Sequence, residues 1–217
     1  MNVLITGISS DIGQVIAEKF HNRGWNVFGT YYKTIYHASM FTLYKVDFEI
    51  LGLVNTFVRK LDKRIDCLID CVGDYCDNSL YTFKLNCISH IILHKELFQK
   101  MKKNNFGRII SISSIAAKYG SSIDNMAYGC SKRALEGIAL TLAREGASHN
   151  VLANNIRAGC IDTKFHQRHK KDMNKRKEMI PMKKLGTTED IAKMAYYLGS
   201  EENQFITGET ITIAGGE

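Results

Sequence analysis

Short apolar runs alternate along the chain with longer segments in which apolar residues recur every three or four positions. The short runs predict strands at residues 3–5, 27–31, 41–46, 67–71, 108–113, 151–156 and 210–213. The longer segments predict helices at residues 12–23, 51–61, 83–102, 126–148 and 188–198. Because the strands are apolar on both faces and alternate with helices, we expect an α/β fold with a doubly wound parallel sheet.

One connection departs from this alternation. Only the eight residues 33–40 join the second and third predicted strands, whereas a parallel crossover takes about a dozen or more. We therefore expect a shortened helix or a loop there.

Length and composition favour a single domain. The chain has 217 residues and a single proline, Pro181, which argues against Pro-rich linkers and extended tails. Residues 1–217 are therefore expected to form one domain. No apolar run approaches the roughly 18 residues of a membrane span, so we expect no membrane partner.

The net charge of +7 is concentrated in one segment. Residues 164–184 hold nine Lys or Arg and two acids, which leaves 20 of each sign elsewhere. A local excess favours a local anionic ligand over a nucleic-acid-coating surface, so we expect no nucleic-acid partner.

The cysteines indicate a reducing compartment. None forms a CxxC pair, and several lie in apolar runs, so we interpret them as buried thiols of a cytoplasmic protein. They are Cys67, Cys71, Cys76, Cys87, Cys130 and Cys160.

A glycine turn follows the first predicted strand and opens the first helix. Its sequence, TGISSDIG, spans residues 6–13. Free backbone N–H groups and the helix dipole at such a place hold a dinucleotide pyrophosphate, the arrangement of the Rossmann fold. A purely structural turn is the alternative.

Tyr128 and Lys132 lie four residues apart, on one face of a predicted helix. A tyrosine is a poor acid or base at neutral pH unless its phenolate is stabilised, and a cation one turn away does that. A solvated Tyr/Lys pair is the alternative for this spacing taken alone.

Together these motifs resemble the short-chain dehydrogenase/reductase family over essentially the whole chain. Residues 6–13 are similar to its TGxxxGxG turn, residues 70–73 to its NNAG strand end, and residues 158–163 to its PGxIxT segment. The ending, from Lys184-Leu185-Gly186 to Gly215-Gly216, is most similar to 3-oxoacyl-acyl-carrier-protein reductases.

The resemblance implies a catalytic set and a reaction, the NAD(P)H-dependent reduction of a carbonyl to an alcohol. Tyr128 would donate the proton, Ser114 would hydrogen-bond the carbonyl oxygen, Lys132 would lower the Tyr128 pKa and bind the nicotinamide ribose, and Asn86 would hold a relay water. Ser113 is a rival to Ser114, because alternation along the strand turns only one of them toward the site.

The resemblance also implies cofactor contacts. They are Gly7, Ser9, Ser10, Asp11, Ile12, Gly13, Tyr31, Lys33, Asp47, Cys71, Gly73, Tyr128, Lys132, Gly159, Ile161 and Thr163. No acid follows the second strand and Lys33 lies nearby, so we predict that NADP(H) is preferred over NAD(H). Asp47 is at the adenine-contacting position, and capping of the helix that starts near Phe48 is its alternative role.

The chain departs from the family pattern in three places. Asp11 replaces a glycine beside the pyrophosphate, so it must turn away or bond a ribose hydroxyl. Asp70 and Cys71 replace the asparagine pair, which leaves the hydrogen bonds at that strand end open. Ala158 replaces the proline and is expected to loosen the loop over the nicotinamide.

Residues 160–186 correspond to the substrate loop. Its cations suit an anionic substrate, either carrier-bound or a small molecule, and a solvated charge run is the alternative. The short 73–86 segment suits a keto-sugar or another small carbonyl compound and predicts an open mouth. A non-catalytic dinucleotide-sensing subunit is a third alternative.

His90 and His94 lie four apart on a helix without an evident third metal ligand, so we expect no metal. In the family this helix packs against a partner subunit, which assigns the two histidines to an interface and predicts a homodimer or homotetramer. His166 and His169 in the basic loop show no ligand framework.

Overall fold

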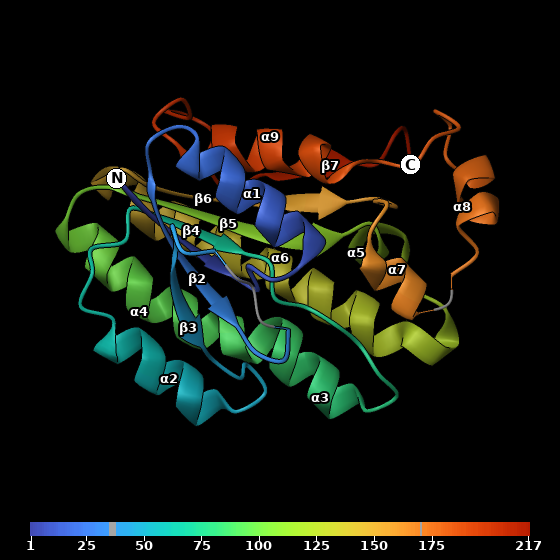
Figure 1. The fold of residues 1–217 in the computed structure, drawn as a ribbon, viewed down its shortest axis with the longest axis horizontal. Coiled ribbons are helices and arrows are strands. Elements are labelled where there is room, and N and C mark those ends of the chain that lie inside the picture. Colours follow the sequence, from blue (N-terminus) through green and yellow to red (C-terminus); the bar gives the residue numbers. More distant parts are fainter. Residues whose placement is uncertain (35–37, 170) are drawn as a thin grey trace.

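The strands form a single parallel sheet. A computed structural model describes residues 1–34, 38–169 and 171–217, and within them seven strands pair in the order β3-β2-β1-β4-β5-β6-β7 (Figure 1). They are β1 (Asn2–Thr6), β2 (Asn26–Tyr31), β3 (Thr42–Lys45), β4 (Cys67–Asp70), β5 (Gly107–Ser114), β6 (Val151–Ala158) and β7 (Thr210–Ile213). Each neighbouring pair is parallel, which confirms the predicted α/β class.

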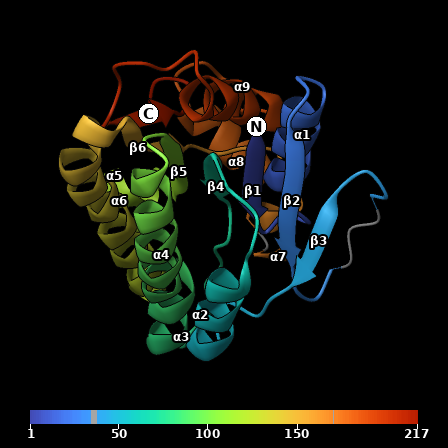
Figure 2. The ribbon, with the colours of Figure 1, turned by 90° about the vertical axis from the view of Figure 1, so that its left-hand side faces the viewer.

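Helices cover both faces of the sheet. α1 (Asp11–His21) and α9 (Thr188–Gly199) lie side by side on one face. α2 (Leu51–Lys60), α4 (Ser89–Lys103) and α6 (Met126–Gly146) cover the other face, as Figure 2 shows edge-on.

Alternation along β1 explains the two layers. Val3 and Ile5 pack with Phe20 of α1 and Leu198 of α9, whereas Leu4 packs on the opposite face against α2 and α4. All three β1 side chains are fully buried, which is why the strand has no polar face.

The helix predicted at residues 83–102 begins earlier and is interrupted. α3 (Ser79–Phe83) leads into a π-helical turn (Lys84–Ile88), and α4 follows directly. The Ser89 N–H bonds the Lys84 carbonyl, five residues back, so the turn rotates the following residues relative to a regular helix. Asn86 lies in this turn.

Three short helices are not predicted by the apolar periodicity of the sequence. They are α5 (Ala116–Tyr119), α7 (Lys164–Arg168) and α8 (Met173–Met179). Helices of one or two turns are too short to show a repeating apolar stripe.

The short connection between β2 and β3 agrees with the sequence as far as it is described. No helix occurs in residues 32–34 and 38–41, and residues 35–37 lie outside the described part. Across the described chain, moreover, no helix is both long and apolar enough to span a bilayer.

The cysteines are free thiols, but the prediction that they are buried is only partly right. Cys67, Cys87 and Cys160 are buried, whereas Cys76 and Cys130 are exposed. Cys76 follows the strand end in a surface loop, and Cys130 lies on the outer face of α6.

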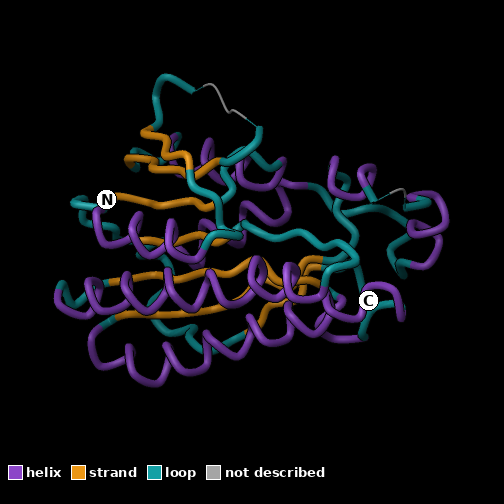
Figure 3. The backbone as a smooth tube through the Cα atoms, turned by 90° about the horizontal axis from the view of Figure 1, so that it is seen from below, coloured by secondary structure: helices purple, strands orange, loops and turns teal. Residues whose placement is uncertain are grey.

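The candidate residues gather where the strands end. Chain order reverses between β1 and β4, and in such sheets ligands bind beyond the carboxyl ends of the strands at this switch point. α7 and α8 lie at the same end of the molecule (Figures 1 and 3).

Candidate active site

The glycine turn after β1 has the shape of an anion cradle. Gly7 has a φ of +61°, and a Cβ on Gly13 would lie 2.6 Å from the Gly7 carbonyl oxygen. The Ser10 hydroxyl caps α1 by accepting from the Gly13 N–H at 3.1 Å. Ser9 and Ile12 complete the turn. A positive φ, absent side chains and a helix N-terminus fit a pyrophosphate.

Asp11 does not point into this cradle. Its carboxylate accepts from the backbone N–H of Lys164, the first residue of α7, at 2.6 Å, and the Lys164 ammonium lies 3.8 Å from its other oxygen. Of the two options that the sequence left open for Asp11, the structure therefore has the carboxylate turned away, onto the substrate loop.

The ends of β2 and β3 carry the residues expected near the adenosine. Tyr31 ends β2, and Lys33 lies 5.5 Å above the ring of Tyr32. The Asp47 carboxylate accepts from the Glu49 N–H at 2.9 Å and bonds the Tyr32 side chain, which raises the Tyr32 pKa.

The helix-capping alternative for Asp47 is wrong. α2 begins at Leu51, and its N-cap is Ile50, which makes no side-chain cap. The Asp47 carboxylate is used in a local turn instead.

Tyr128 and Ser114 meet across the site. Burial raises the pKa of Tyr128 to about 12, and its hydrogen bond with the Ser114 side chain acts in the opposite direction. Ser113 points to the other face of β5, where its hydroxyl donates to Glu136 at 2.7 Å. The geometry thus favours Ser114 over Ser113.

Lys132 is buried one turn after Tyr128. Its ammonium donates to the Ile112 carbonyl at 2.9 Å, and burial lowers its pKa to about 8. A Cβ on Gly73 would lie 2.7 Å from this ammonium. The expected lowering of the Tyr128 pKa by Lys132 is therefore not found: the Tyr128 pKa is raised overall, only the Ser114 hydrogen bond opposes the rise, and the Lys132 ammonium is bound to the Ile112 carbonyl.

The Asn86 side chain fixes the loop after β4. Its amide nitrogen donates to the Asp74 carbonyl at 2.9 Å and to the Ser131 hydroxyl at 3.0 Å, and its oxygen accepts from the Asp74 N–H at 3.0 Å. Both amide hydrogens are used, so a relay water would bind an oxygen of this residue.

Asp70 and two histidines form a fully buried cluster at the end of β4. The Asp70 carboxylate bonds His90 Nδ1, His94 Nε2 (2.9 Å) and the Thr6 hydroxyl. The pKa of Asp70 lies well below its usual range, because the two histidines outweigh the opposing effect of burial.

The assignment of the histidines to an interface is therefore wrong. His90 and His94 are 0% and 1% exposed, so they face the sheet and not a partner subunit. A third potential metal ligand, Asp70, also lies beside them.

Aromatic side chains cover Tyr128, so the expected open mouth is not found. The Tyr75 ring lies 5.0 Å from the Tyr128 ring, and Phe165 of α7 lies 6.2 Å from it. His169 stacks on Tyr75 at 3.8 Å with an interplanar angle of 15°. The short loop after Gly73 folds Tyr75 over the site instead of leaving it open.

Two carboxylates hold α7 in this position. Asp11 binds its first N–H group, and Asp74 binds His169 Nε2 at 2.7 Å and the Arg168 guanidinium at 3.4 Å. Asp11 opens α1 after β1, and Asp74 lies in the loop after β4, so both carboxylates follow central strands of the sheet.

The segment after β6 is well ordered by contacts. Ala158 is the last residue of β6 and pairs with Ser114 and Ile213, so its replacement of a proline does not loosen the chain at this point. A Cβ on Gly159 would lie 2.7 Å from Ala214. Ile161 bridges Gly186, and its carbonyl accepts from Thr163 Oγ1 at 3.3 Å.

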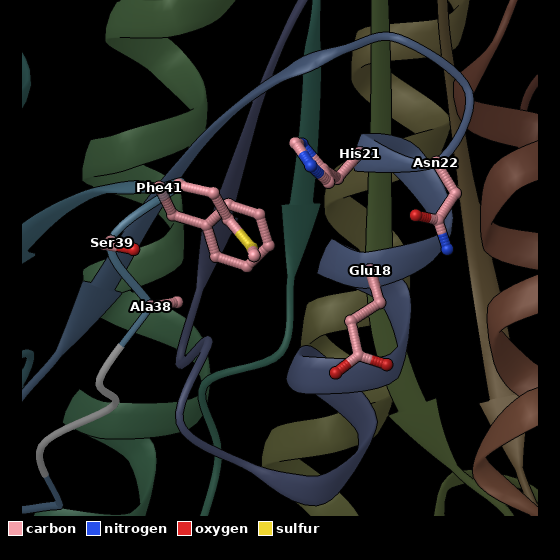
Figure 4. Close-up of a pocket in the computed structure, with 7 residues that line it drawn as sticks. Glu18, His21, Asn22, Ala38, Ser39 and Phe41 are labelled. Atoms are coloured by element: carbon pink, nitrogen blue, oxygen red, sulfur yellow. The ribbon is translucent and has the colours of Figure 1, made fainter.

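A surface hollow lies away from this site. It is lined by the end of α1 and by the segment before β3 (Figure 4), with Glu18, His21 and Phe41 among its residues. These are the amino-terminal edges of the strands, and none of the candidate residues lines it.

Sequence reasoning missed the Asp70 cluster and the cover formed by Tyr75, Asp74, Phe165 and His169. The sequence contains a signal for the cluster, an acid at a strand end and an HxxxH spacing on a helix, but only the fold brings these residues together. The sequence contains no signal for the cover, because its two parts are far apart along the chain.

Known proteins resemble the chain along its length. A family profile described as enoyl-(acyl carrier protein) reductase matches residues 7–217. The 3-oxoacyl-acyl-carrier-protein reductases of Buchnera aphidicola and Salmonella typhimurium are each 30% identical, over 98% of this chain and 95% of theirs.

Solved structures agree. ElxO with NADP bound superposes with a TM-score of 0.88 at 28% identity, covering 99% of this chain and 97% of its own. A 3-oxoacyl-(acyl-carrier-protein) reductase from Agrobacterium tumefaciens with NADP bound gives 0.89 at 25% identity, covering 100% of this chain and 93% of its own.

The tether at Asp74 is testable. Asp74→Ala removes the ion pairs to His169 and Arg168, so amide hydrogen exchange in residues 164–169 should accelerate about tenfold, while β5 stays protected. Hydrogen-exchange mass spectrometry measures both segments.

Asp172→Ala is the matched control, because Asp172 caps α8 in the same loop and does not touch α7. Equal acceleration of residues 164–169 in both variants would contradict the tether.

Proposed function

Because the chain belongs to the short-chain dehydrogenase/reductase family, we propose that it uses NADPH to reduce the 3-oxo group of a carrier-bound acyl thioester, with Tyr128 as proton donor. At the coarser level its chemistry follows from its relatives: it is an NAD(P)-dependent oxidoreductase that converts a carbonyl to an alcohol, similar to 3-oxoacyl-acyl-carrier-protein reductases.

The observation that carries the proposal is the meeting of Tyr128, Ser114 and Lys132 beside the glycine turn. The hydroxyls of Tyr128 on α6 and Ser114 on β5 bond each other, so both can turn toward the carbonyl oxygen of one substrate. A solvated Tyr/Lys pair would not bury its lysine, yet Lys132 is 5% exposed.

Each residue then has a physical task. The Tyr128 hydroxyl gives its proton to the carbonyl oxygen as negative charge develops there, and the Ser114 hydroxyl donates a second hydrogen bond to the same oxygen. The Lys132 ammonium supplies positive charge near the resulting phenolate and binds ribose hydroxyls. Asn86 holds the loop after β4 and a relay water.

A bound nicotinamide cofactor supplies the hydride. The glycine turn suits its pyrophosphate, since a side chain at Gly13 has no room. The residues proposed to hold the cofactor are Gly7, Ser9, Ser10, Ile12, Gly13, Tyr31, Lys33, Asp47, Cys71, Gly73, Tyr128, Lys132, Gly159, Ile161 and Thr163. Asp11 supports the site indirectly, through Lys164.

The substrate loop, residues 160–186, supports a carrier-bound substrate through its exposed cations. Lys175 and Lys177 are exposed on α8, whereas Arg176 is already bound to Glu217 at 2.8 and 3.1 Å. Lys170 of the same basic segment lies outside the described residues. An acidic carrier protein suits such a surface.

We also propose a homodimer or homotetramer in the cytoplasm. Ile91 of α4 and Leu140 of α6 are 46% and 56% exposed, and these neighbouring helices would form the interface. Each of the six cysteines is a free thiol, as suits a reducing compartment.

The reaction is tested by NADPH consumption across 3-oxoacyl thioesters and keto-sugars. Tyr128→Phe should lower kcat by about 100-fold or more, because the proton donor is lost. Ser114→Ala should lower it by about 100-fold, whereas Ser113→Ala, the matched control, should keep most of the turnover.

Turnover that survives Tyr128→Phe would contradict the mechanism. A preference for keto-sugars would favour a small-carbonyl reductase, and NADPH binding without turnover of any substrate would favour a dinucleotide-sensing subunit.

The cofactor preference rests on Lys33. We expect tighter binding of NADPH than NADH, and Lys33→Ala should weaken NADPH about tenfold with little effect on NADH, because a cation that pairs with the 2′-phosphate is lost. Fluorescence titration gives both constants. Lys63→Ala, in the exposed loop after α2, should change neither, and equal or better wild-type affinity for NADH would refute the preference.

Carrier recognition is tested on α8. The Lys175→Ala/Lys177→Ala double variant should raise KM several-fold for a substrate on acyl carrier protein, more at low salt than at high salt, and leave KM for a small thioester unchanged. The Lys60→Ala/Lys103→Ala pair is the control. An unchanged KM in the α8 variant would leave only a solvated charge run.

A further inference from the structure

The Asp70 carboxylate is a fully buried charge at the floor of the site. It ends β4, and its bonds go to the Thr6 hydroxyl and to the rings of His90 and His94. Among the residues that the structure describes, no lysine or arginine forms an ion pair with it.

The contacts within this cluster are hydrogen bonds rather than an ion site. Ligands that share a tetrahedral zinc ion lie about 3.3 Å apart, whereas His94 Nε2 is 2.9 Å from the carboxylate and His90 Nδ1 is closer. Metal-bound histidines also donate their second N–H to a partner, but His90 Nε2 and His94 Nδ1 have none among the described residues.

The bonding pattern fixes the tautomers. A carboxylate only accepts, so the protons sit on His90 Nδ1 and His94 Nε2, the two atoms that face it. The opposite nitrogens lack partners, and a second proton on either ring would be a buried donor with no acceptor. The Asp70 carboxylate is therefore the hydrogen-bond acceptor at the centre of the cluster.

The Lys132 ammonium lies near the end of β4. Asp70 pairs with Ser111 across β4 and β5, and the following residue, Ile112, accepts the hydrogen bond from the Lys132 ammonium. Gly73, three residues after Asp70, leaves room for the same ammonium.

The other carboxylates near Lys132 already have cationic partners. Asp74 bonds His169 and Arg168, and Glu136 is bound by Arg157 at 2.6 and 2.9 Å. Cys71, directly after β4, is the remaining titratable group near Lys132, and burial raises its pKa well above the ordinary value of a thiol, so it stays a neutral thiol.

We propose that Asp70 is a positioning residue for the reaction: it is the buried counter-charge that keeps Lys132 protonated, and His90, His94 and Thr6 hold it ionised. Its role in catalysis rests on the function proposed for Lys132, but its effect on the charge of Lys132 does not. This role explains why the chain has an acid at residue 70, where the family has asparagine.

The titration of Lys132 supports this assignment. Burial lowers the Lys132 pKa to about 8, and Asp70 is the strongest of the carboxylates that oppose the lowering, ahead of Asp74 and Glu136. Since an ammonium is lost as pH rises through its pKa, a further decrease would discharge Lys132 near neutral pH.

The decisive variant is Asp70→Asn, which removes the charge and keeps the shape. An asparagine oxygen can accept from both histidines, and the Thr6 hydroxyl can reverse to accept from the new amide. The Lys132 pKa is read from the pH titration of its ¹³Cε resonance in lysine-labelled protein, assigned by its loss in Lys132→Met.

We expect the Lys132 pKa to decrease by about one unit in Asp70→Asn. Asp66→Asn is the matched control: Asp66 is also a buried acid, four residues earlier at the opposite end of the strand, where it binds Arg64. The Asp66→Asn substitution should leave the Lys132 pKa unchanged. An unchanged pKa in Asp70→Asn, or an equal decrease in both variants, would overturn the proposal.

Turnover provides the second readout. In Asp70→Asn the alkaline decrease of kcat should move to lower pH by the same amount, with near wild-type kcat at the acidic end. A loss of kcat that is uniform in pH would show a merely structural role and overturn the proposal. Absence of turnover in the wild type would refute the proposed function and leave the Lys132 titration as an independent result.

A measurement on the wild type covers the case in which Asp70→Asn does not fold. The Asp70 carboxyl carbon should keep the ¹³C shift of a carboxylate at pH 6. A protonated Asp70 at that pH, or a stoichiometric metal ion in the purified protein that is lost in His94→Gln, would overturn the proposal.

Discussion

A buried ammonium group at the carboxyl edge of the sheet constrains everything around it. Lys132 loses hydration on entering the protein, which opposes its charge, and yet the proposed reaction requires that charge. The groups around Lys132 make room for the side chain and stabilise its charge. Gly73 provides space, the Ile112 carbonyl provides an acceptor, and the end of β4 provides a carboxylate.

The departures from the family pattern acquire physical meaning in this setting. Asp70 ends β4 and binds two buried histidines, which have no other polar partner among the residues that the structure describes. Asp11 turns from the pyrophosphate cradle to the first N–H of α7. In each case an acid that looks misplaced in the sequence is bound by groups that are distant along the chain.

Sequence patterns predicted what depends on local periodicity. The strands, the long helices and the loop in place of a second crossover helix follow from apolar spacing, and the turn from Gly7 to Gly13 follows from backbone requirements. What could not be predicted depends on side chains from separate elements. His90 and His94 were assigned to an interface because helix spacing does not reveal which face meets the sheet, and Tyr75 gave no sign that it covers Tyr128.

Asp74 forms separate bonds through its backbone and through its side chain. Its peptide group is locked to the Asn86 amide, whereas its carboxylate reaches out to His169 and Arg168 of the covering segment. A rotation about one Asp74 side-chain bond therefore releases one of the two carboxylate contacts that hold the covering segment, and the backbone beneath stays where Asn86 fixes it. The covering segment can therefore move without displacing the backbone that Asn86 holds below it, so substrate entry need not disturb that part of the site.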